Sequence, residues 1–233
     1  MRAAEIERER RRLLREIADE MRVCASATGR DTLSPRVVAA LEATPRHRFV
    51  PPGMVPFAYE NRPLAIGLGQ TISQPFIVAL MTDMLDLKPG DIVLEIGTGS
   101  GYQAAVLAQL VKQVYSVETL PELARTAQEH LQELGYRNVE VRVGDGHAGW
   151  AEHAPYDAII VTAAAPVIPP ALIEQLRPGG RMMIPVGARY MAQDLVLITK
   201  DAGGAIRTRS VLPVAFVPLV ESAPAQANEP HPL

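Results

Sequence analysis

The middle of the chain alternates short apolar runs with longer amphipathic segments. The strands that they predict are four or five residues long and mostly apolar, and they span 92–96, 114–117, 139–143, 158–162 and 181–185. The segments between several of them repeat apolar residues at helical spacing, and they span 102–111, 121–134 and 169–176. Strands that alternate with helices in this way predict an α/β domain with a doubly wound, mostly parallel sheet and helices on both faces.

The first third of the chain predicts helices instead. Residues 1–24 carry apolar positions at helical spacing among many charges, so we expect a helix with a solvated charged face. Residues 37–43 predict a second helix, which Ser34 caps. A more apolar helix is predicted over 75–85, after a connection rich in proline and glycine.

The last strands predict an antiparallel pair, because 194–199 and 210–218 flank a Gly-Gly turn. The end of the chain is rich in alanine and proline, which indicates disorder. We therefore divide the chain into a charged N-terminal helix and turn (1–32), one α/β domain (33–221) and a disordered tail (222–233).

Composition excludes several classes of protein. The 233 residues are 48% hydrophobic and 21% charged, as expected for a globular domain with a core, and the net charge of -3 argues against a nucleic-acid partner. One cysteine, Cys24, and five histidines without metal-ligand spacing predict no metal site. Neither a membrane-spanning run nor an apolar signal-peptide core is visible, so we expect a cytoplasmic protein with no membrane partner.

A glycine-rich loop follows the first strand of the alternating part, where a doubly wound sheet binds its ligand. Its glycines are Gly97, Gly99 and Gly101, and Tyr102 stands where a dinucleotide-binding loop needs a further glycine. Glu95 places a carboxylate at the strand end, which is unfavourable beside a pyrophosphate but suits a cation. The loop therefore favours a sulfonium cofactor over NAD.

Acidic residues also end the next two strands. Glu118 lies 21 positions after Gly97, where a carboxylate can accept hydrogen bonds from both ribose hydroxyls, and Asp145, beside Gly146, can accept from an adenine amino group. Each carboxylate could alternatively be an ordinary strand-end cap or surface charge. Three acidic groups at three successive strand ends favour a nucleoside-containing cofactor.

Several segments resemble, in order, the motifs of protein-L-isoaspartate O-methyltransferases, which are class I S-adenosylmethionine-dependent methyltransferases. Leu94–Tyr102 resembles the first motif of that class, and residues 69–75, with the sequence GQTISQP, resemble a segment specific to the family. Residues 144–146, 157–164 and 216–219 resemble the later motifs. The resemblance covers 33–220 and leaves the charged helix and the tail unmatched.

The resemblance implies a Rossmann-like methyltransferase sheet, S-adenosylmethionine as cofactor, and methyl transfer to the free carboxylate of L-isoaspartyl residues in damaged proteins and peptides. The cofactor-binding residues would be Glu95, Gly97, Thr98, Gly99, Ser100, Gly101, Glu118, Asp145 and Gly146. The substrate-binding residues would be Thr71, Ile72, Ser73, Val214, Phe216 and Val217. We expect the protein to act as a monomer.

Ser73 is the expected catalytic residue. A carboxylate is already ionised at neutral pH, so it needs orientation more than a base, and one serine hydroxyl can donate a hydrogen bond to it. Ser73 could instead only cap the helix that starts at Pro75. The strand over 214–219 could hold a peptide through its backbone or be a plain buried strand. Trp150 and Tyr102 could flank an adenosine or belong to the core.

Two other functions remain open. A methyltransferase acting on a small molecule would keep the glycine loop, Glu118 and Asp145, but it would leave residues 71–75 unexplained. A nucleotide-binding scaffold without turnover would not need the complete set of motifs.

Overall fold

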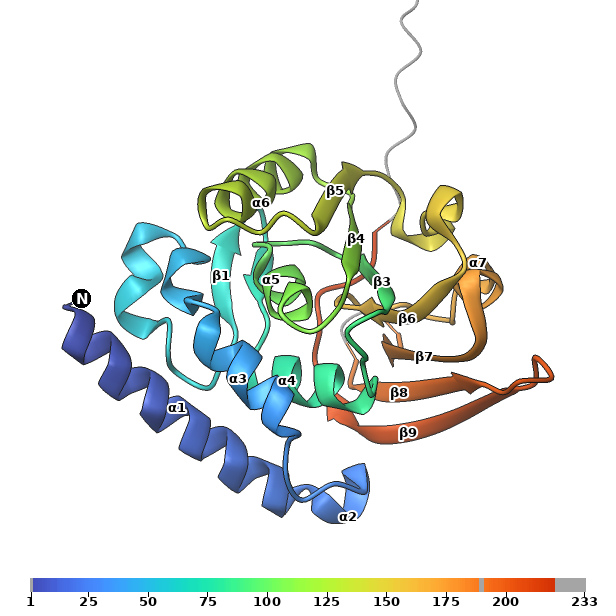
Figure 1. Cartoon of the computed structure of the whole chain (residues 1–233), viewed down its shortest axis with the longest axis horizontal. Coiled ribbons are helices and arrows are strands. Elements are labelled where there is room, and N and C mark those ends of the chain that lie inside the picture. Colours follow the sequence, from blue (N-terminus) through green and yellow to red (C-terminus); the bar gives the residue numbers. More distant parts are fainter. Residues whose placement is uncertain (1, 189–190, 221–233) are drawn as a thin grey trace, which may run out of the picture.

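The computed structural model describes residues 2–188 and 191–220. A seven-stranded sheet with the order β5-β4-β3-β6-β7-β8-β9 runs through the molecule (Figure 1). Its strands are β3 (Ile92–Ile96), β4 (Gln113–Glu118), β5 (Val139–Val143), β6 (Tyr156–Val161), β7 (Leu176–Val186), β8 (Gln193–Lys200) and β9 (Ile206–Val214). The strands from β3 to β7 pair in parallel, and β8 and β9 add an antiparallel pair at one edge. The predicted fold class is confirmed.

Helices cover the two faces of this sheet unequally. They are α1 (Ala3–Val23), α2 (Ala25–Thr28), α3 (Pro35–Ala43), α4 (Pro75–Met84), α5 (Tyr102–Ala108), α6 (Pro121–Glu133) and α7 (Pro170–Gln175). Buried residues of α1, α3, α4 and α5 belong to the larger hydrophobic core, whereas α7 packs on the opposite face. No helix among the described residues is long and apolar enough to cross a membrane.

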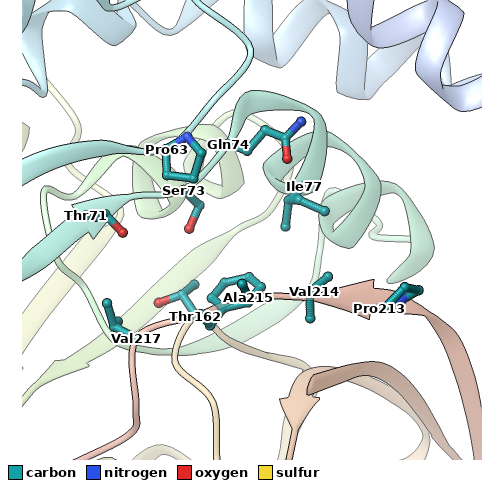
Figure 2. A pocket seen from close by; sticks show the side chains of 11 residues that line it. Pro63, Thr71, Ser73, Gln74, Ile77, Thr162, Pro213, Val214, Ala215 and Val217 are labelled. Carbon is teal, nitrogen blue, oxygen red and sulfur yellow. The ribbon is translucent and has the colours of Figure 1, made fainter. Parts of the chain in front are cut away.

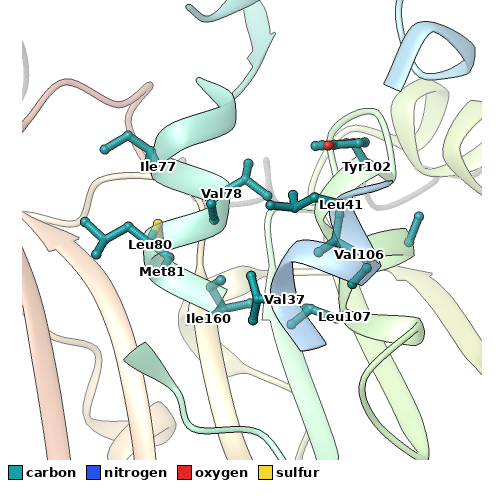
Figure 3. Close-up of a cluster of buried hydrophobic side chains, with 14 of the residues drawn as sticks. Val37, Leu41, Ile77, Val78, Leu80, Met81, Tyr102, Val106, Leu107 and Ile160 are labelled. Atoms are coloured by element: carbon teal, nitrogen blue, oxygen red, sulfur yellow. The ribbon is translucent and has the colours of Figure 1, made fainter. Parts of the chain in front are cut away.

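The two cores follow from the alternation of side chains along each strand. In β6, Ala158 and Ile160 face the larger core, while Ile159 and Val161 face the smaller one. Figure 3 shows Ile160 meeting side chains of α3, α4 and α5. Strands buried on both faces read as continuous apolar runs, which is why the sequence predicts them well.

The N-terminal helix is part of the same packed structure. Leu13, Ile17 and Met21 of α1 are buried, and α1 packs against α4. Its charged residues form ion pairs along its own surface, such as that between Arg11 and Glu7. The predicted amphipathic helix over 1–24 is therefore confirmed, with a short second helix, α2, immediately after it.

The order of the strands in the sheet indicates where a ligand would bind. The chain runs from β3 outward through β4 to β5, and then returns to β6 on the other side of β3. The direction of winding therefore changes between β3 and β6, and a ligand of such a sheet binds outside the carboxyl ends of the strands at this point.

Four local predictions differ from the structure. A hairpin of β1 (Leu64–Gly67) and β2 (Gln70–Ile72) was not predicted. The helix predicted to reach residue 111 ends at Ala108, and the strand predicted over 181–185 begins earlier, at Leu176, with a bulge at 177–180. The strand predicted over 210–218 ends at Val214, because the following residues leave the sheet. The tail predicted to be disordered, 222–233, lies outside the described residues.

Candidate active site

A cavity of about 420 Å³ lies between the start of α4 and the residues that follow β9 (Figure 2). We call it the large cavity, and its lining residues are Pro63, Thr71, Ser73, Gln74, Ile77, Thr162, Pro213, Val214, Ala215, Phe216 and Val217. Its volume is typical of a small-ligand site. Five of the six predicted substrate-binding residues line it. The sixth, Ile72, is buried beside it and lines a smaller space.

The hydroxyl of Ser73 faces the large cavity, together with those of Thr71 and Thr162 (Figure 2). The N-cap of α4 is Gln74, and no N-cap side chain bonds to the helix. Asn61 supplies that bond from outside the helix, because its Oδ1 accepts from the amide of Phe76 at 3.0 Å. The alternative that Ser73 serves only as a helix cap is therefore wrong.

A second, smaller cavity lies against the glycine loop, and we call it the loop cavity. Its volume is about 50 Å³, and its walls include Gly97, Gly99, Glu118, Gly146 and residues 217–220. Thr71 and Thr162 line both this cavity and the large one, so the two spaces meet at these residues. Four of the nine predicted cofactor-binding residues line the loop cavity, namely Gly97, Gly99, Glu118 and Gly146, and their binding role stays a prediction.

Two positions beside the loop cavity require glycine. Gly97 has a φ of 93°, and a Cβ there would lie 2.5 Å from Oγ1 of Thr162. A Cβ at Gly146 would lie 2.5 Å from Cγ2 of Ile96 and 3.0 Å from Cδ1 of Leu219. Thr162 in turn donates a hydrogen bond to the carbonyl oxygen of Gly97 at 2.6 Å. The loop therefore presents backbone rather than side chains to the cavity.

Glu95 does not line the loop cavity. It is fully buried beneath the loop, where it accepts a hydrogen bond from the hydroxyl of Ser116, which in turn contacts Oγ1 of Thr98 at 2.6 Å. Burial raises the pKa of Glu95 to about 8, the hydrogen bond from Ser116 opposes this shift, and neighbouring Glu118 adds to it. Glu95 is thus mostly protonated at neutral pH. The sequence-based argument that its negative charge faces a cation does not hold.

The remaining loop residues, Thr98, Ser100 and Gly101, have structural roles beneath the loop. Thr98 and Ser100 are buried, and the hydroxyl of Ser100 accepts from the amide of Tyr102 at 3.3 Å at the start of α5. Both line a third space, the inner cavity of about 30 Å³, together with Ile72 and Ser73. Gly101 has a φ of 86° and forms the N-cap of α5.

Neither Asp145 nor Trp150 lines the loop cavity. The carboxylate of Asp145 accepts from the amide of His147 at 2.9 Å and contacts the ring of that residue at 3.0 Å. Trp150 is buried in the smaller core and packs against Tyr115. Its alternative assignment as a core residue is confirmed, whereas a contact between Asp145 and adenine stays a prediction.

The residues after β9 are held by a side chain that the sequence analysis missed. Gln193 is buried in β8, its Oε1 accepts from the amide of Phe216 at 2.7 Å, and its Nε2 donates to the carbonyl oxygen of Phe216 at 3.5 Å. The amide of Ala164 then donates to the carbonyl oxygen of Val217 at 2.8 Å. The strand predicted over 214–219 is thus replaced by a segment that crosses from β9 to the end of β6.

Thr162 was also missed as a site residue, although it lies in a motif that the sequence analysis singled out. Its place at the end of β6, beside the change in winding direction, was the available signal. Gln193 gave no such signal.

Among the described residues, no three His, Cys, Asp or Glu side chains gather as metal ligands would.

Comparisons with known proteins agree with this geometry. The sequence profile of the protein-L-isoaspartate(D-aspartate) O-methyltransferase family matches residues 21–224. A protein-L-isoaspartate O-methyltransferase of Cupriavidus necator is 59% identical over 89% of this chain and 80% of that protein. One from Gloeobacter violaceus is 54% identical over 82% of this chain and 92% of that protein.

Solved structures are similar as well. A structure described as a protein-L-isoaspartate O-methyltransferase, from Plasmodium falciparum in complex with S-adenosyl-L-homocysteine, has a TM-score of 0.71 and 26% identity, over 80% of this chain and 91% of that one. A second structure of a protein-L-isoaspartate O-methyltransferase has a TM-score of 0.75 and 28% identity, over 88% of this chain and 66% of that one.

Proposed function

We propose roles for individual site residues on the basis that the chain belongs to the protein-L-isoaspartate(D-aspartate) O-methyltransferase family. Its activity is the transfer of a methyl group from S-adenosylmethionine to the free carboxylate of L-isoaspartyl residues in damaged proteins and peptides, which initiates their repair. The roles of individual residues below are our proposal.

The cofactor would be held at the loop cavity. Glu118 offers two carboxylate oxygens for the ribose hydroxyls, and the close packing around Gly97 and Gly146 supports a cradle made of backbone. The space of about 50 Å³ is small for a nucleoside, so occupation requires the walls of the loop cavity to move apart. S-adenosylmethionine supplies a methyl group that its sulfonium already activates.

The acceptor carboxylate would bind in the large cavity, where the hydroxyl of Ser73 donates a hydrogen bond to one of its oxygens. The other oxygen is then free to attack the methyl carbon. None of the 11 lining residues is charged, so the cavity offers no group that would act as a strong base. A carboxylate that is already ionised does not need one, and its orientation carries the catalysis.

The segment after β9 would hold the peptide around the damaged residue. Gln193 engages the backbone of Phe216, whereas the amide and carbonyl groups of Ala215 have no hydrogen-bond partner among the described residues. Ala215 lines the large cavity, and we propose that these backbone groups pair with the backbone of an extended peptide. Backbone pairing does not depend on side chains, which suits an enzyme that repairs many proteins.

The observation that carries this proposal is the convergence of Ser73 and Glu118 on two cavities that share Thr71 and Thr162. The experiment compares an isoaspartyl peptide with its aspartyl twin under S-adenosylmethionine. A base-labile methyl ester on the isoaspartyl peptide alone is expected. Methylation of neither peptide, with turnover of a small-molecule acid instead, would favour the alternative methyltransferase.

We further propose that the protein acts as a monomer in the cytoplasm. Sedimentation of the full chain and fractionation of cells that express it would test the two statements separately. A dimer at micromolar concentration, or recovery from a membrane fraction, would contradict them.

A further inference from the structure

The side chain of Arg46 lies behind Ser73, inside the protein. Arg46 begins a short 3₁₀ helix, Arg46–Arg48, and it is 1% exposed. Its Nη2 donates a hydrogen bond to the carbonyl oxygen of Ser73 at 2.8 Å, and its Nε donates to the carbonyl oxygen of Ala58 at 2.9 Å. The guanidinium therefore ties the backbone of the catalytic serine to the connection that precedes β1.

This buried cation has no carboxylate partner among residues 2–188 and 191–220. Its guanidinium carbon stands 4.8 Å from the ring centre of Tyr102, a side chain that opposes the effect of burial on the pKa of Arg46, and its Nη1 has no hydrogen-bond partner of good geometry among the described residues. Burial lowers the pKa of Arg46 to about 10, which still leaves the side chain protonated at neutral pH. Buried charges are normally paired, whereas the charge of Arg46 is left without a compensating carboxylate among the described residues.

The large cavity, on the other side of Ser73, can receive an anion. All of its lining residues are neutral, so a carboxylate there would meet dipoles and the charge behind Ser73. The attraction between a carboxylate and a cation is stronger in a poorly solvated cavity than in water. These observations connect the unpaired cation to the acceptor that the proposed function places in this cavity.

We propose that Arg46 is a positioning residue for the acceptor. It holds the backbone of Ser73 so that the hydroxyl meets the carboxylate, and its charge balances that of the carboxylate through Ser73. The proposal rests on the proposed function, because it takes the isoaspartyl carboxylate as the anion in the large cavity.

The two parts of this role affect different kinetic constants. The methyl ester is neutral, so the attraction acts on the ionised acceptor before transfer and is lost when the ester forms. Removal of the charge therefore raises KM for the peptide. Removal of the hold on Ser73 lowers kcat instead, because a misaligned hydroxyl no longer aims the attacking oxygen.

Two substitutions separate these effects. Arg46→Gln removes the charge and keeps a donor, and we expect KM for an isoaspartyl peptide to rise at least about tenfold. Arg46→Lys keeps the charge and loses the planar fork, so kcat should fall while KM stays within about threefold of wild type. An unchanged KM in a folded Arg46→Gln variant would overturn the proposal.

Arg36 provides a matched control. It also donates to two backbone carbonyl oxygens, those of Leu87 at 2.7 Å and Leu110 at 2.6 Å, but it is exposed and makes no hydrogen bond to Ser73. Arg36→Gln should lower the melting temperature without changing KM for the peptide. An equal rise of KM in both variants would show that Arg46 has only a structural role.

A measurement on the wild-type protein keeps the proposal testable if the Arg46 variants do not fold. The isoaspartyl peptide and its isoasparaginyl amide analogue have nearly the same shape, but only the first carries a charge at this position. We expect the amide to bind at least about tenfold more weakly in calorimetry. Equal affinities, with normal methylation of the isoaspartyl peptide, would overturn the role of Arg46 alone. Absence of methylation would instead contradict the proposed function.

Discussion

The Oε2 atom of Glu118 accepts a hydrogen bond from the backbone amide of Gly99 at 2.8 Å. Its Oε1 accepts from the amide of Leu120 at 3.0 Å, so one carboxylate joins the glycine loop to the start of α6. Each carboxylate oxygen can accept a second hydrogen bond. The same side chain can therefore shape the loop and receive the ribose hydroxyls.

Glu118→Ala should weaken binding of S-adenosylhomocysteine by about 2–4 kcal/mol, because the ribose loses its charged acceptor and the loop loses an anchor. Isothermal titration calorimetry would measure the change. Glu118→Gln should have a milder effect, since one acceptor oxygen remains. Glu122 lies exposed in the first turn of α6, and Glu122→Ala is the control that should leave the affinity unchanged. A wild-type dissociation constant in Glu118→Ala would refute the assignment.

Ser73→Ala should lower turnover of an isoaspartyl peptide about ten- to a hundredfold, which corresponds to the loss of one orienting hydrogen bond. Affinity for S-adenosylhomocysteine and the melting temperature should stay nearly unchanged, because the serine does not cap α4. Ser73→Thr should keep more activity than Ser73→Ala. Ser73→Asp should remain inactive, since its carboxylate repels that of the acceptor. Full activity of the aspartate variant would contradict the catalytic role.

Gly97→Ala should destabilise the protein more than Gly67→Ala. Both residues have positive φ, 93° and 99°, but a Cβ at Gly67 would meet nothing within 4 Å, whereas one at Gly97 would meet Oγ1 of Thr162. We expect Gly67→Ala to cost roughly 1–2 kcal/mol of backbone strain and Gly97→Ala a further 1–3 kcal/mol or so. Urea unfolding measures both costs. Equal losses would mean that Thr162 does not crowd the loop.

The buried Glu95 should make stability depend on pH. Because its folded-state pKa of about 8 lies above the ordinary value of 4.5, the folded protein holds one more proton between these limits. Its contribution to stability is therefore present in full below pH 4.5 and is lost as the pH rises toward 8. Glu95→Gln removes this titration, so its unfolding free energy should fall less steeply over that range, by up to about 1.4 kcal/mol per pH unit. Parallel curves for the two proteins would show that Glu95 is ionised in the fold.

The sheet could be predicted because each of its central strands is a run of apolar residues buried on both faces. The hairpin of β1 and β2 could not, since its strands are four and three residues long and Leu68 at its tip has a φ of 51°. Short strands with a left-handed residue between them have no clear periodicity.

The positions of functional residues were predicted better than their electrostatic states. Ser73 and Glu118 reach the two cavities because the motifs that contain them stand at defined ends of secondary-structure elements. Glu95 stands in such a motif too, but its protonation depends on complete burial, which a sequence does not reveal. The burial of Arg46 could not be predicted either, since an arginine in a proline-rich connection is normally exposed.

Gln193 holds the segment after β9 without recognising any side chain in it. Both of its hydrogen bonds go to the backbone of Phe216, so residue 216 can change its identity, except to proline, and still be held. Asparagine at 193 would be one methylene too short to reach, and glutamate could not donate. We therefore expect substitutions to be tolerated unevenly here: residue 216 can change without loss of these two hydrogen bonds, whereas Gln193 cannot be replaced by asparagine or glutamate.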